Sequence, residues 1–323
     1  MSIVARVASR PAVAEGSGGF AAAVLEGLKS DPKWLSAKYF YDSAGSRLFE
    51  QITQLPEYYP TRTELGILNR HAAAIARLIP ARAALVEFGS GSSTKASILL
   101  GAAPQAAAYV PVDISAEFLH REAAALRRQF PRLAVIPVDA DFSRPFDLPA
   151  EIAALLRVGF FPGSTIGNFE PDDALAFLRN AGRTLGAGAP FIVGVDLVKD
   201  VGVLHAAYND AAGVTARFNL NILVRINREL GANFDLQRFE HRAFYDAGHA
   251  RIEMHLVSLG RQKVTICGET IAFRPGETIH TENSYKYTPD SFAALAHAAG
   301  WSAHARWTDA DDYFAVYALV PPI

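Results

Sequence analysis

The chain has 323 residues, of which 50% are hydrophobic and 20% are charged. Its 31 basic and 33 acidic side chains give a formal net charge of −2. These values exclude a disordered chain and give no basic surface for nucleic acid or an anionic membrane. The one cysteine, Cys267, excludes an internal disulfide framework, and no apolar run reaches the ~20 residues of a membrane helix. We therefore expect a globular, cytoplasmic protein of about two domains.

The N-terminal region changes in composition near residue 35. Residues 1–19 are rich in alanine, glycine and serine and contain no compact apolar stretch, so we expect a loose arm rather than a secretory signal. From residue 35 to residue 64 aromatic and polar side chains are dense. Thr61, with Glu64 three positions further on, has the spacing of a capping box and predicts the start of a helix.

Short apolar runs then alternate with helix-like segments. The runs are residues 83–88, 107–112, 133–138, 158–161 and 191–195. Helical patterns fall between them, for example at 116–129 and 171–185. Strands that are apolar on both faces and alternate with helices predict an α/β fold with a doubly wound, Rossmann-like parallel sheet.

After Asp196 the alternation ends. Residues 203–230 read as two helices, followed by strand-like segments with turns at 246–248 and 267–268, a helix at 289–299 and a strand pair at 301–307 and 313–320. We therefore predict a core of residues 61–196, to which residues 288–323 return. Residues 1–60 and the insertion 197–287 would form a second, smaller α+β lobe that binds the substrate.

Three successive predicted strands end in residues suited to a nucleoside. Gly89 and Gly91 follow the first strand, but the third glycine of a dinucleotide fingerprint is missing, which disfavours a pyrophosphate. Asp113 ends the second strand and could accept both ribose hydroxyls. Asp141 and Phe142 follow the third and could meet an adenine ring. Each has a plain alternative as a turn or helix cap, but together they indicate S-adenosylmethionine.

The loop after the fourth predicted strand has two glycines beside uncharged polar groups. It contains Gly163, Ser164, Thr165, Gly167 and Asn168. In methyltransferases of this architecture the corresponding loop faces the methyl group that is transferred. An ordinary strand-to-helix turn is the alternative interpretation.

Six segments resemble one family. They are residues 38–42 (KYFYD), 55–64 (LPEYYPTRTE), 163–168 (GSTIGN), 196–200 (DLVKD), 208–215 (YNDAAGVT) and 251–254 (RIEM). Together they resemble the L-histidine Nα-methyltransferases of ergothioneine biosynthesis. The resemblance runs from about residue 35 to the C-terminus, and it implies a class I methyltransferase sheet.

The resemblance also implies a cofactor and a substrate site. The residues that would contact S-adenosylmethionine, and S-adenosylhomocysteine as product, are Tyr58, Gly89, Lys95, Asp113, Asp141 and Phe142. The residues that would contact L-histidine are Tyr41, Phe49, Gly163, Thr165, Asn168, Tyr208, Met254, Glu282 and Ser284. Asn168 and Tyr208 would hold the α-carboxylate, whereas Tyr41, Gly163 and Thr165 would face the α-amine.

Glu282 and Ser284 would meet the imidazole ring. Their spacing of two suits a β-strand, in which both side chains point the same way. Neutral imidazole has one donor and one acceptor nitrogen, so a carboxylate and a hydroxyl can bind both. Without the resemblance, an exposed strand with a surface Glu and Ser is the simpler interpretation.

The implied reaction transfers a methyl group to the α-nitrogen of L-histidine three times and gives N,N,N-trimethylhistidine (hercynine). Tyr41 is the candidate catalytic residue, which would orient the nitrogen and relay its proton with water. A methyltransferase of another amino acid such as tryptophan, and a non-catalytic S-adenosylmethionine-binding sensor, remain alternatives. The missing glycine disfavours a nicotinamide oxidoreductase.

Metal, macromolecular and subunit partners have no sequence support. The nine histidines show neither an HExxH pattern nor Cys/His metal spacing, so we predict no metal. We predict no nucleic-acid and no membrane partner, and a monomer, because no coiled-coil pattern or apolar stripe indicates an oligomer.

Overall fold

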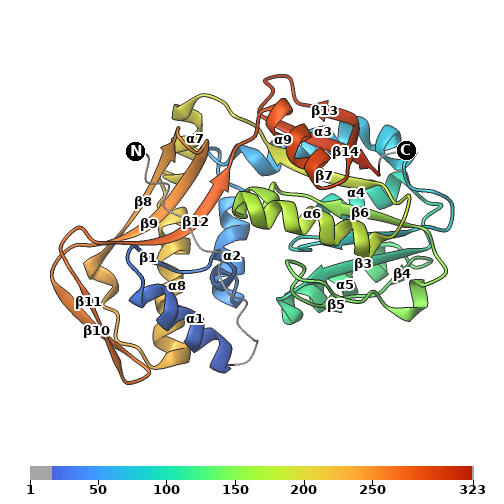
Figure 1. Ribbon diagram of the computed structural model, residues 1–323. Coiled ribbons are helices and arrows are strands. Elements are labelled where there is room, and N and C mark those ends of the chain that lie inside the picture. Colours follow the sequence, from blue (N-terminus) through green and yellow to red (C-terminus); the bar gives the residue numbers. More distant parts are fainter. Residues whose placement is uncertain (1–16, 322–323) are drawn as a thin grey trace.

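The computed structural model describes residues 17–321, which form two lobes side by side (Figure 1). The predicted loose arm lies mostly outside the described residues, but its last three residues begin helix α1 (Ser17–Lys29), so that part of the prediction is wrong. The helix is fixed there because Phe20, Val24 and Leu28, spaced four apart, enter a hydrophobic core.

The larger lobe is built on an eight-stranded sheet. In spatial order its path is β13 (Ser302–Thr308), β14 (Phe314–Val320), β7 (Phe191–Asp196), β6 (Arg157–Phe161), β2 (Ala84–Phe88), β3 (Ala108–Asp113) and β4 (Ala134–Val135), and β5 (Val138–Asp139) also pairs with β3. All pairs from β7 to β4 and β5 are parallel, whereas β14 is antiparallel to its neighbours. The predicted Rossmann-like sheet is confirmed. The single strand predicted at 133–138 is wrong, since two short strands replace it around Pro137, which lacks an N–H donor.

Helices cover both faces of this sheet. One face carries α3 (Tyr59–Ala76), α4 (Thr94–Ala102) and α5 (Ala116–Gln129), and the other carries α6 (Pro171–Leu185) and α9 (Pro289–Ala298). The helices that follow β2 and β6 lie on opposite faces although these two strands are neighbours. Such a switch point leaves a crevice at the carboxyl ends of the strands, where ligands of this fold bind.

The smaller lobe has a four-stranded sheet and a separate hairpin. The sheet order is β1 (Lys33–Trp34), β12 (Thr278–Tyr285), β9 (Arg251–Ser258) and β8 (Phe239–Asp246), and the hairpin is β10 (Gln262–Ile266) and β11 (Glu269–Phe273). Its core also takes α1, α2 (Ser43–Ile52), α7 (Val201–Tyr208) and α8 (Val214–Leu230). Residues before 60 and residues of 197–287 thus share one core, while the domain boundaries stay a prediction.

Short 3₁₀ helices complete the described chain. They are η1 (Ala37–Phe40), η2 (Ala150–Ile152), η3 (Thr165–Asn168) and η4 (Leu236–Arg238). Among the helices of residues 17–321, none combines the length and the apolarity needed to cross a bilayer.

The predicted capping box at Thr61 and Glu64 is wrong. Helix α3 starts earlier, with Tyr58 at its N-cap position and Pro60 in its first turn, so Thr61 already lies inside the helix. Proline suits this position because its missing N–H would have no helical partner there. Glu64 is fully buried, and its carboxylate serves the site described next.

Candidate functional site

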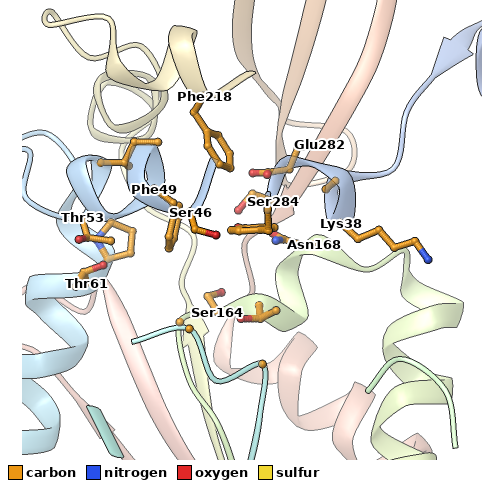
Figure 2. A pocket seen from close by; sticks show the side chains of 18 of the residues that line it. Lys38, Ser46, Phe49, Thr53, Thr61, Ser164, Asn168, Phe218, Glu282 and Ser284 are labelled. Atoms are coloured by element: carbon orange, nitrogen blue, oxygen red, sulfur yellow. The ribbon is translucent and has the colours of Figure 1, made fainter. Parts of the chain in front are cut away.

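A cavity of about 1020 Å³ lies between the carboxyl ends of the parallel strands and the smaller lobe. The predicted site residues all line it: Tyr41, Phe49, Tyr58, Gly89, Lys95, Asp113, Asp141, Phe142, Gly163, Thr165, Asn168, Tyr208, Met254, Glu282 and Ser284. Figure 2 shows that Phe49, Phe218, Glu282 and Ser284 project into the same space. The fold therefore brings the predicted residues together, while their individual roles stay predictions.

The loop after β2 lines the cavity at Gly89 and passes close to the ring of Phe142. Gly89 has a φ of +73°, and a Cβ atom on it would lie 3.2 Å from the ring of Phe142. Asp113, at the end of β3, accepts a hydrogen bond of 2.8 Å from the backbone N–H of Ser115. Ser115, not Asp113, holds the N-cap position of α5, so the cap interpretation of Asp113 is wrong. Burial raises the pKa of the Asp113 carboxyl.

A buried ion pair supports the loop after β6. Glu64 accepts hydrogen bonds of 3.0 and 2.9 Å from the backbone N–H of Gly163, and it pairs with Lys95 Nζ at 2.5 Å. Gly163 has a φ of +81°. The sequence pattern assigned Glu64 to a helix cap, so its contact with the Gly163 loop was missed. The sequence did offer one sign of it, because Glu64 is an acidic residue on the apolar face of a predicted helix.

The same loop packs directly on strand β12. A Cβ atom on Gly167 would lie only 2.7 Å from the backbone oxygen of Tyr285. This contact explains why a glycine stands at position 167 and why Asn168, at the end of η3, lies close to Ser284 (Figure 2). Asp196, at the end of β7, donates its backbone N–H to Ser164 Oγ at 2.9 Å, which fixes the loop from its other side.

Aromatic rings from α2, α7, α8 and the segments that flank α2 form one wall of the cavity. The ring centroid of Phe49 lies 5.7 Å from that of Tyr41, 6.2 Å from that of Tyr58 and 6.0 Å from that of Phe218. The ring centroids of Tyr58 and Tyr208 are 6.4 Å apart. Phe218 lies on α8 and was missed by the sequence interpretation, because an aromatic residue on the apolar face of a helix looks like ordinary core. The negative faces of such rings favour cationic ligands.

Three phenols of this wall stay protonated. Burial raises the pKa of Tyr41, Tyr58 and Tyr208 well above the ordinary value, and the nearby Glu282 carboxylate adds to the effect in each. Tyr41 can therefore donate or accept a hydrogen bond but is no strong base at neutral pH.

Glu282 and Ser284 lie two residues apart on β12 and both line the cavity, so the predicted strand is confirmed. Met254 stands opposite Glu282 on β9. Burial raises the pKa of Glu282 to about 7, although the positive charge of Lys286 acts in the opposite direction. The Glu282 carboxyl thus exchanges its proton near neutral pH.

A buried charge network lies behind this strand. Asp196 accepts hydrogen bonds from Tyr59 at 2.7 and 2.8 Å, pairs with Lys199 at 2.6 Å and pairs with Lys286 at 2.8 Å. The two lysines keep the pKa of Asp196 low despite its burial. Tyr208 donates a hydrogen bond of 2.7 Å to Ser284 Oγ. The family motifs contained Asp196 and Lys199, but sequence reasoning gave no role to Lys286.

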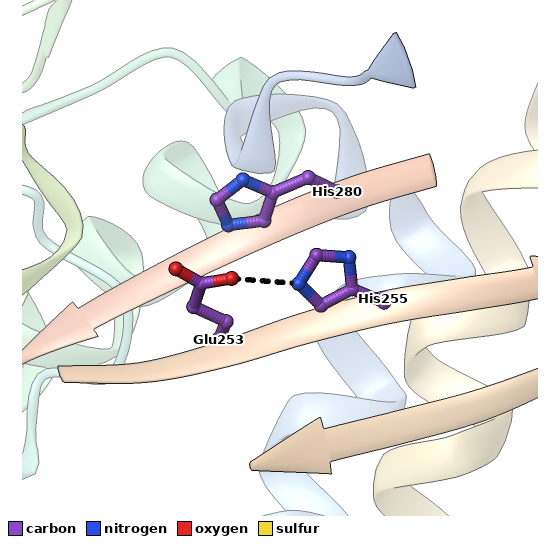
Figure 3. Close-up of side chains that lie close together, drawn as sticks. All are labelled: Glu253, His255 and His280. Atoms are coloured by element: carbon purple, nitrogen blue, oxygen red, sulfur yellow. Dashed lines mark hydrogen bonds and ion pairs between the residues drawn. The ribbon is translucent and has the colours of Figure 1, made fainter. Parts of the chain in front are cut away.

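One cluster of potential metal ligands lies on the sheet of the smaller lobe (Figure 3). Ligand atoms of Glu253, His255 and His280 lie within 4.8 Å of one another. The two imidazoles are stacked with centroids 4.7 Å apart and planes 13° apart, so their in-plane lone pairs do not converge. Glu253 already accepts from Arg251 at 2.9 Å and pairs with His255 at 2.8 Å. As arranged, these residues form a hydrogen-bonded stack, and the absence of a metal stays a prediction.

Comparisons with known proteins agree with this site. A family model described as histidine-specific methyltransferase, SAM-dependent, matches residues 20–321. The chain is 42% identical to a histidine N-alpha-methyltransferase of Mycolicibacterium smegmatis, covering 88% of this chain and 90% of that protein. It is 31% identical to ergothioneine biosynthesis protein 1 of Neurospora crassa, covering 88% of this chain but 33% of that protein.

A more distant relative has another substrate in its name. The chain is 30% identical to a 4-dimethylallyltryptophan N-methyltransferase of Aspergillus fumigatus, covering 92% of both proteins. The family model nevertheless spans almost all of the described residues, and the first relative is similar over nearly its whole length. The chain therefore belongs to the family of histidine-specific, S-adenosylmethionine-dependent methyltransferases.

Proposed function

We propose that this protein methylates the α-amino group of L-histidine in three successive transfers and so produces hercynine for ergothioneine biosynthesis. One observation carries the proposal: a carboxylate and a hydroxyl, Glu282 and Ser284, face the same cavity as the glycine loop at Gly89. A histidine whose imidazole ring binds Glu282 and Ser284 would place its α-amine toward the loop at Gly163.

The cofactor side suits S-adenosylmethionine. The glycine backbone at Gly89, which packs close to the ring of Phe142, and the carboxylate of Asp113 suit an adenosine without a diphosphate. Tyr58, Lys95, Asp141 and Phe142 complete the proposed contacts. When bound, the cofactor supplies an activated methyl group, so the protein needs to contribute mainly alignment, which can be worth ~7–11 kcal/mol.

The residues around the substrate would orient it and handle its proton. Asn168 would hold the α-carboxylate, and Thr165 would face the amine. Tyr208 would lie beside the carboxylate without donating to it, because its one O–H hydrogen goes to Ser284. Tyr41, which stays protonated because it is buried, would accept an N–H hydrogen bond from the amine and pass the released proton to water. The rings of Tyr41 and Phe49 would stabilise the quaternary ammonium product.

Purified protein incubated with S-adenosylmethionine and each of the twenty amino acids tests this proposal by mass spectrometry of the products. We expect histidine alone to gain three methyl groups. Gain of only one or two would contradict the repeated transfer, and methylation of tryptophan instead would favour the function named for the Aspergillus relative. Cofactor binding without any turnover would indicate a sensor.

We also propose that the enzyme is a cytoplasmic monomer that acts without a metal. Size-exclusion chromatography with light scattering tests the subunit state, and turnover in the presence of a strong chelator tests the metal. A dimer mass, or lost activity that added metal restores, would contradict these two expectations.

A further inference from the structure

The ammonium group of Lys286 is saturated by three acceptors. Its side chain is fully buried just after β12. Nζ lies 2.8 Å from Asp196 Oδ2, 2.7 Å from Ser284 Oγ and 3.1 Å from the Tyr208 hydroxyl. A lysine ammonium has three N–H donors and no acceptor, so each hydrogen has one partner.

This saturation determines what the Ser284 hydroxyl can do. Ser284 Oγ accepts one hydrogen bond from Lys286 and another from Tyr208, each at 2.7 Å. A hydroxyl oxygen has two lone pairs, so both are used. Ser284 lines the cavity, where its O–H hydrogen is available to a ligand. Ser284 is therefore presented as a donor, next to the acceptor Glu282.

We propose that Lys286 is a positioning residue that makes Ser284 a hydrogen-bond donor toward the imidazole of histidine and thereby contributes to substrate selection. The inference rests on the proposed function. A neutral imidazole offers Ser284 a nitrogen lone pair and Glu282 an N–H. An indole ring has an N–H but no such lone pair, so tryptophan would leave the Ser284 hydroxyl unpaired, which disfavours binding.

A purely structural role is the competing explanation, because Lys286 also neutralises Asp196. Lys199 provides the matched control. It is buried too and pairs with Asp196 at 2.6 Å, but its other hydrogen bonds go to Tyr59 and the backbone oxygen of Leu197. Removing either lysine leaves Asp196 with the other one, but of the two lysines Lys286 is the one that contacts the hydroxyls of Ser284 and Tyr208 at the cavity.

The test compares Lys286→Met with Lys199→Met in steady-state histidine methylation at saturating S-adenosylmethionine. For Lys286→Met we expect KM for histidine to rise at least about tenfold with a smaller change in kcat. The reason is that the Ser284 hydroxyl is no longer oriented to donate a hydrogen bond to the imidazole. For Lys199→Met we expect KM within about twofold of wild type, because Lys199 does not line the cavity. Equal changes in KM would overturn the role of Lys286.

The pH profile adds a readout that a structural role would not move. The charged and titratable groups near Glu282 are Lys286, Tyr41, Tyr58, Tyr208 and His280, whose ring nitrogen lies 3.1 Å from the Glu282 backbone oxygen. Lys286 is the cation among them and favours the carboxylate, so its removal should move the acid limb of kcat/KM for histidine to higher pH. An unmoved limb together with an unchanged KM would contradict the proposal.

A second variant guards against misfolding of Lys286→Met. Lys286→Gln keeps an N–H donor for Ser284 but has no charge, so we expect KM to recover partly while the acid limb stays displaced. Calorimetric binding of S-adenosylhomocysteine, equal to wild type, shows that each variant is folded. If the wild-type protein itself fails to methylate histidine, the proposed function is wrong. If the wild-type protein methylates histidine normally but Lys286→Met and Lys199→Met show the same KM and the same pH profile, only the inference on Lys286 is wrong.

Discussion

Two buried carboxylate–lysine pairs serve different parts of the cavity. Glu64 binds the ammonium of Lys95, predicted to contact the cofactor, and the backbone N–H of Gly163, in the loop predicted to face the α-amine. On the substrate side, Asp196 holds Lys286, which binds two side-chain hydroxyls. The first pair fixes a stretch of main chain, whereas the second determines the direction in which hydroxyl hydrogens point.

The difference follows from how each half is built. The cofactor half consists of loops at the ends of adjacent parallel strands, where backbone groups and glycines form the surface. The substrate half collects side chains from the consecutive elements β7 and α7 and from β12, which lies much later in the sequence. A surface of main chain tolerates changes in side chains, but a surface of converging side chains depends on every partner.

The largest effect should come from removing the charge that holds the substrate half together. Asp196→Asn leaves the ammonium groups of Lys199 and Lys286 buried without a counter-charge, and breaking such a pair costs about 3–5 kcal/mol. Glu64→Gln should cost less, about 1–3 kcal/mol, because glutamine still accepts from Gly163. Lys95 is also 17% exposed and can reach water. Urea unfolding measures both free energies.

A nearby aspartate controls for the substitution itself. Asp200→Asn changes the N-cap of α7, where the carboxylate accepts from the N–H groups of Gly202 and Val203. Asparagine caps helices about as well as aspartate, so we expect less than about 0.5 kcal/mol. A larger loss in Glu64→Gln than in Asp196→Asn would reverse the ranking of the two pairs.

Within the substrate half, Glu282→Ala should lower kcat/KM for histidine by about 10- to 100-fold, because a charge-assisted hydrogen bond to the imidazole N–H is lost. Affinity for S-adenosylhomocysteine, measured by calorimetry, should not change. Glu282→Gln, which keeps an oxygen acceptor without charge, should fall between wild type and the alanine variant. Undiminished histidine turnover in Glu282→Ala would contradict the imidazole assignment.

The raised pKa of Glu282 predicts an acid limb. The pKa moves from 4.5 to about 7 on burial, so below pH 7 the carboxyl is mostly protonated and loses its charge-assisted hydrogen bond to the imidazole, keeping only a neutral oxygen acceptor. As pH falls from 7 to 5, kcat/KM for histidine should drop about tenfold per unit. Glu282→Gln should keep only the part of this limb that comes from titration of the substrate. A wild-type limb identical to that of the glutamine variant would be inconsistent with a titrating Glu282.

Sequence patterns predicted the fold, and that Gly89 and Asp113 lie at one edge of the sheet, for a physical reason. Parallel strands buried on both faces are continuous apolar runs, and their ends meet at one edge of the sheet, so Gly89 and Asp113 could be placed together from order alone. Local rules failed where tertiary contacts dominate. Glu64 fits a capping box in sequence, but its burial against Gly163 and Lys95 decided its role.

The substrate half was accessible only through resemblance. Glu282 and Ser284 fit an exposed strand equally well, since no local pattern tells which face of β12 meets a cavity. One partner of Lys286, Ser284, lies two residues away, but Asp196 and Tyr208 come from other segments, and no spacing rule connects these two to Lys286. Such networks depend on the packing of one lobe against the other, which sequence periodicity does not encode.

The smallest effect should arise where the cofactor half depends on backbone shape alone. Gly89→Ala places a Cβ at a φ of +73° and 3.2 Å from the ring of Phe142, which costs about 1–2 kcal/mol. If that ring contacts the adenine, affinity for S-adenosylhomocysteine should fall about five- to thirtyfold in calorimetry. Gly91→Ala is the control, since its Cβ meets nothing within 4 Å, and we expect wild-type affinity. Equal losses in both variants would mean that the loop needs flexibility in general, rather than the close approach at Gly89.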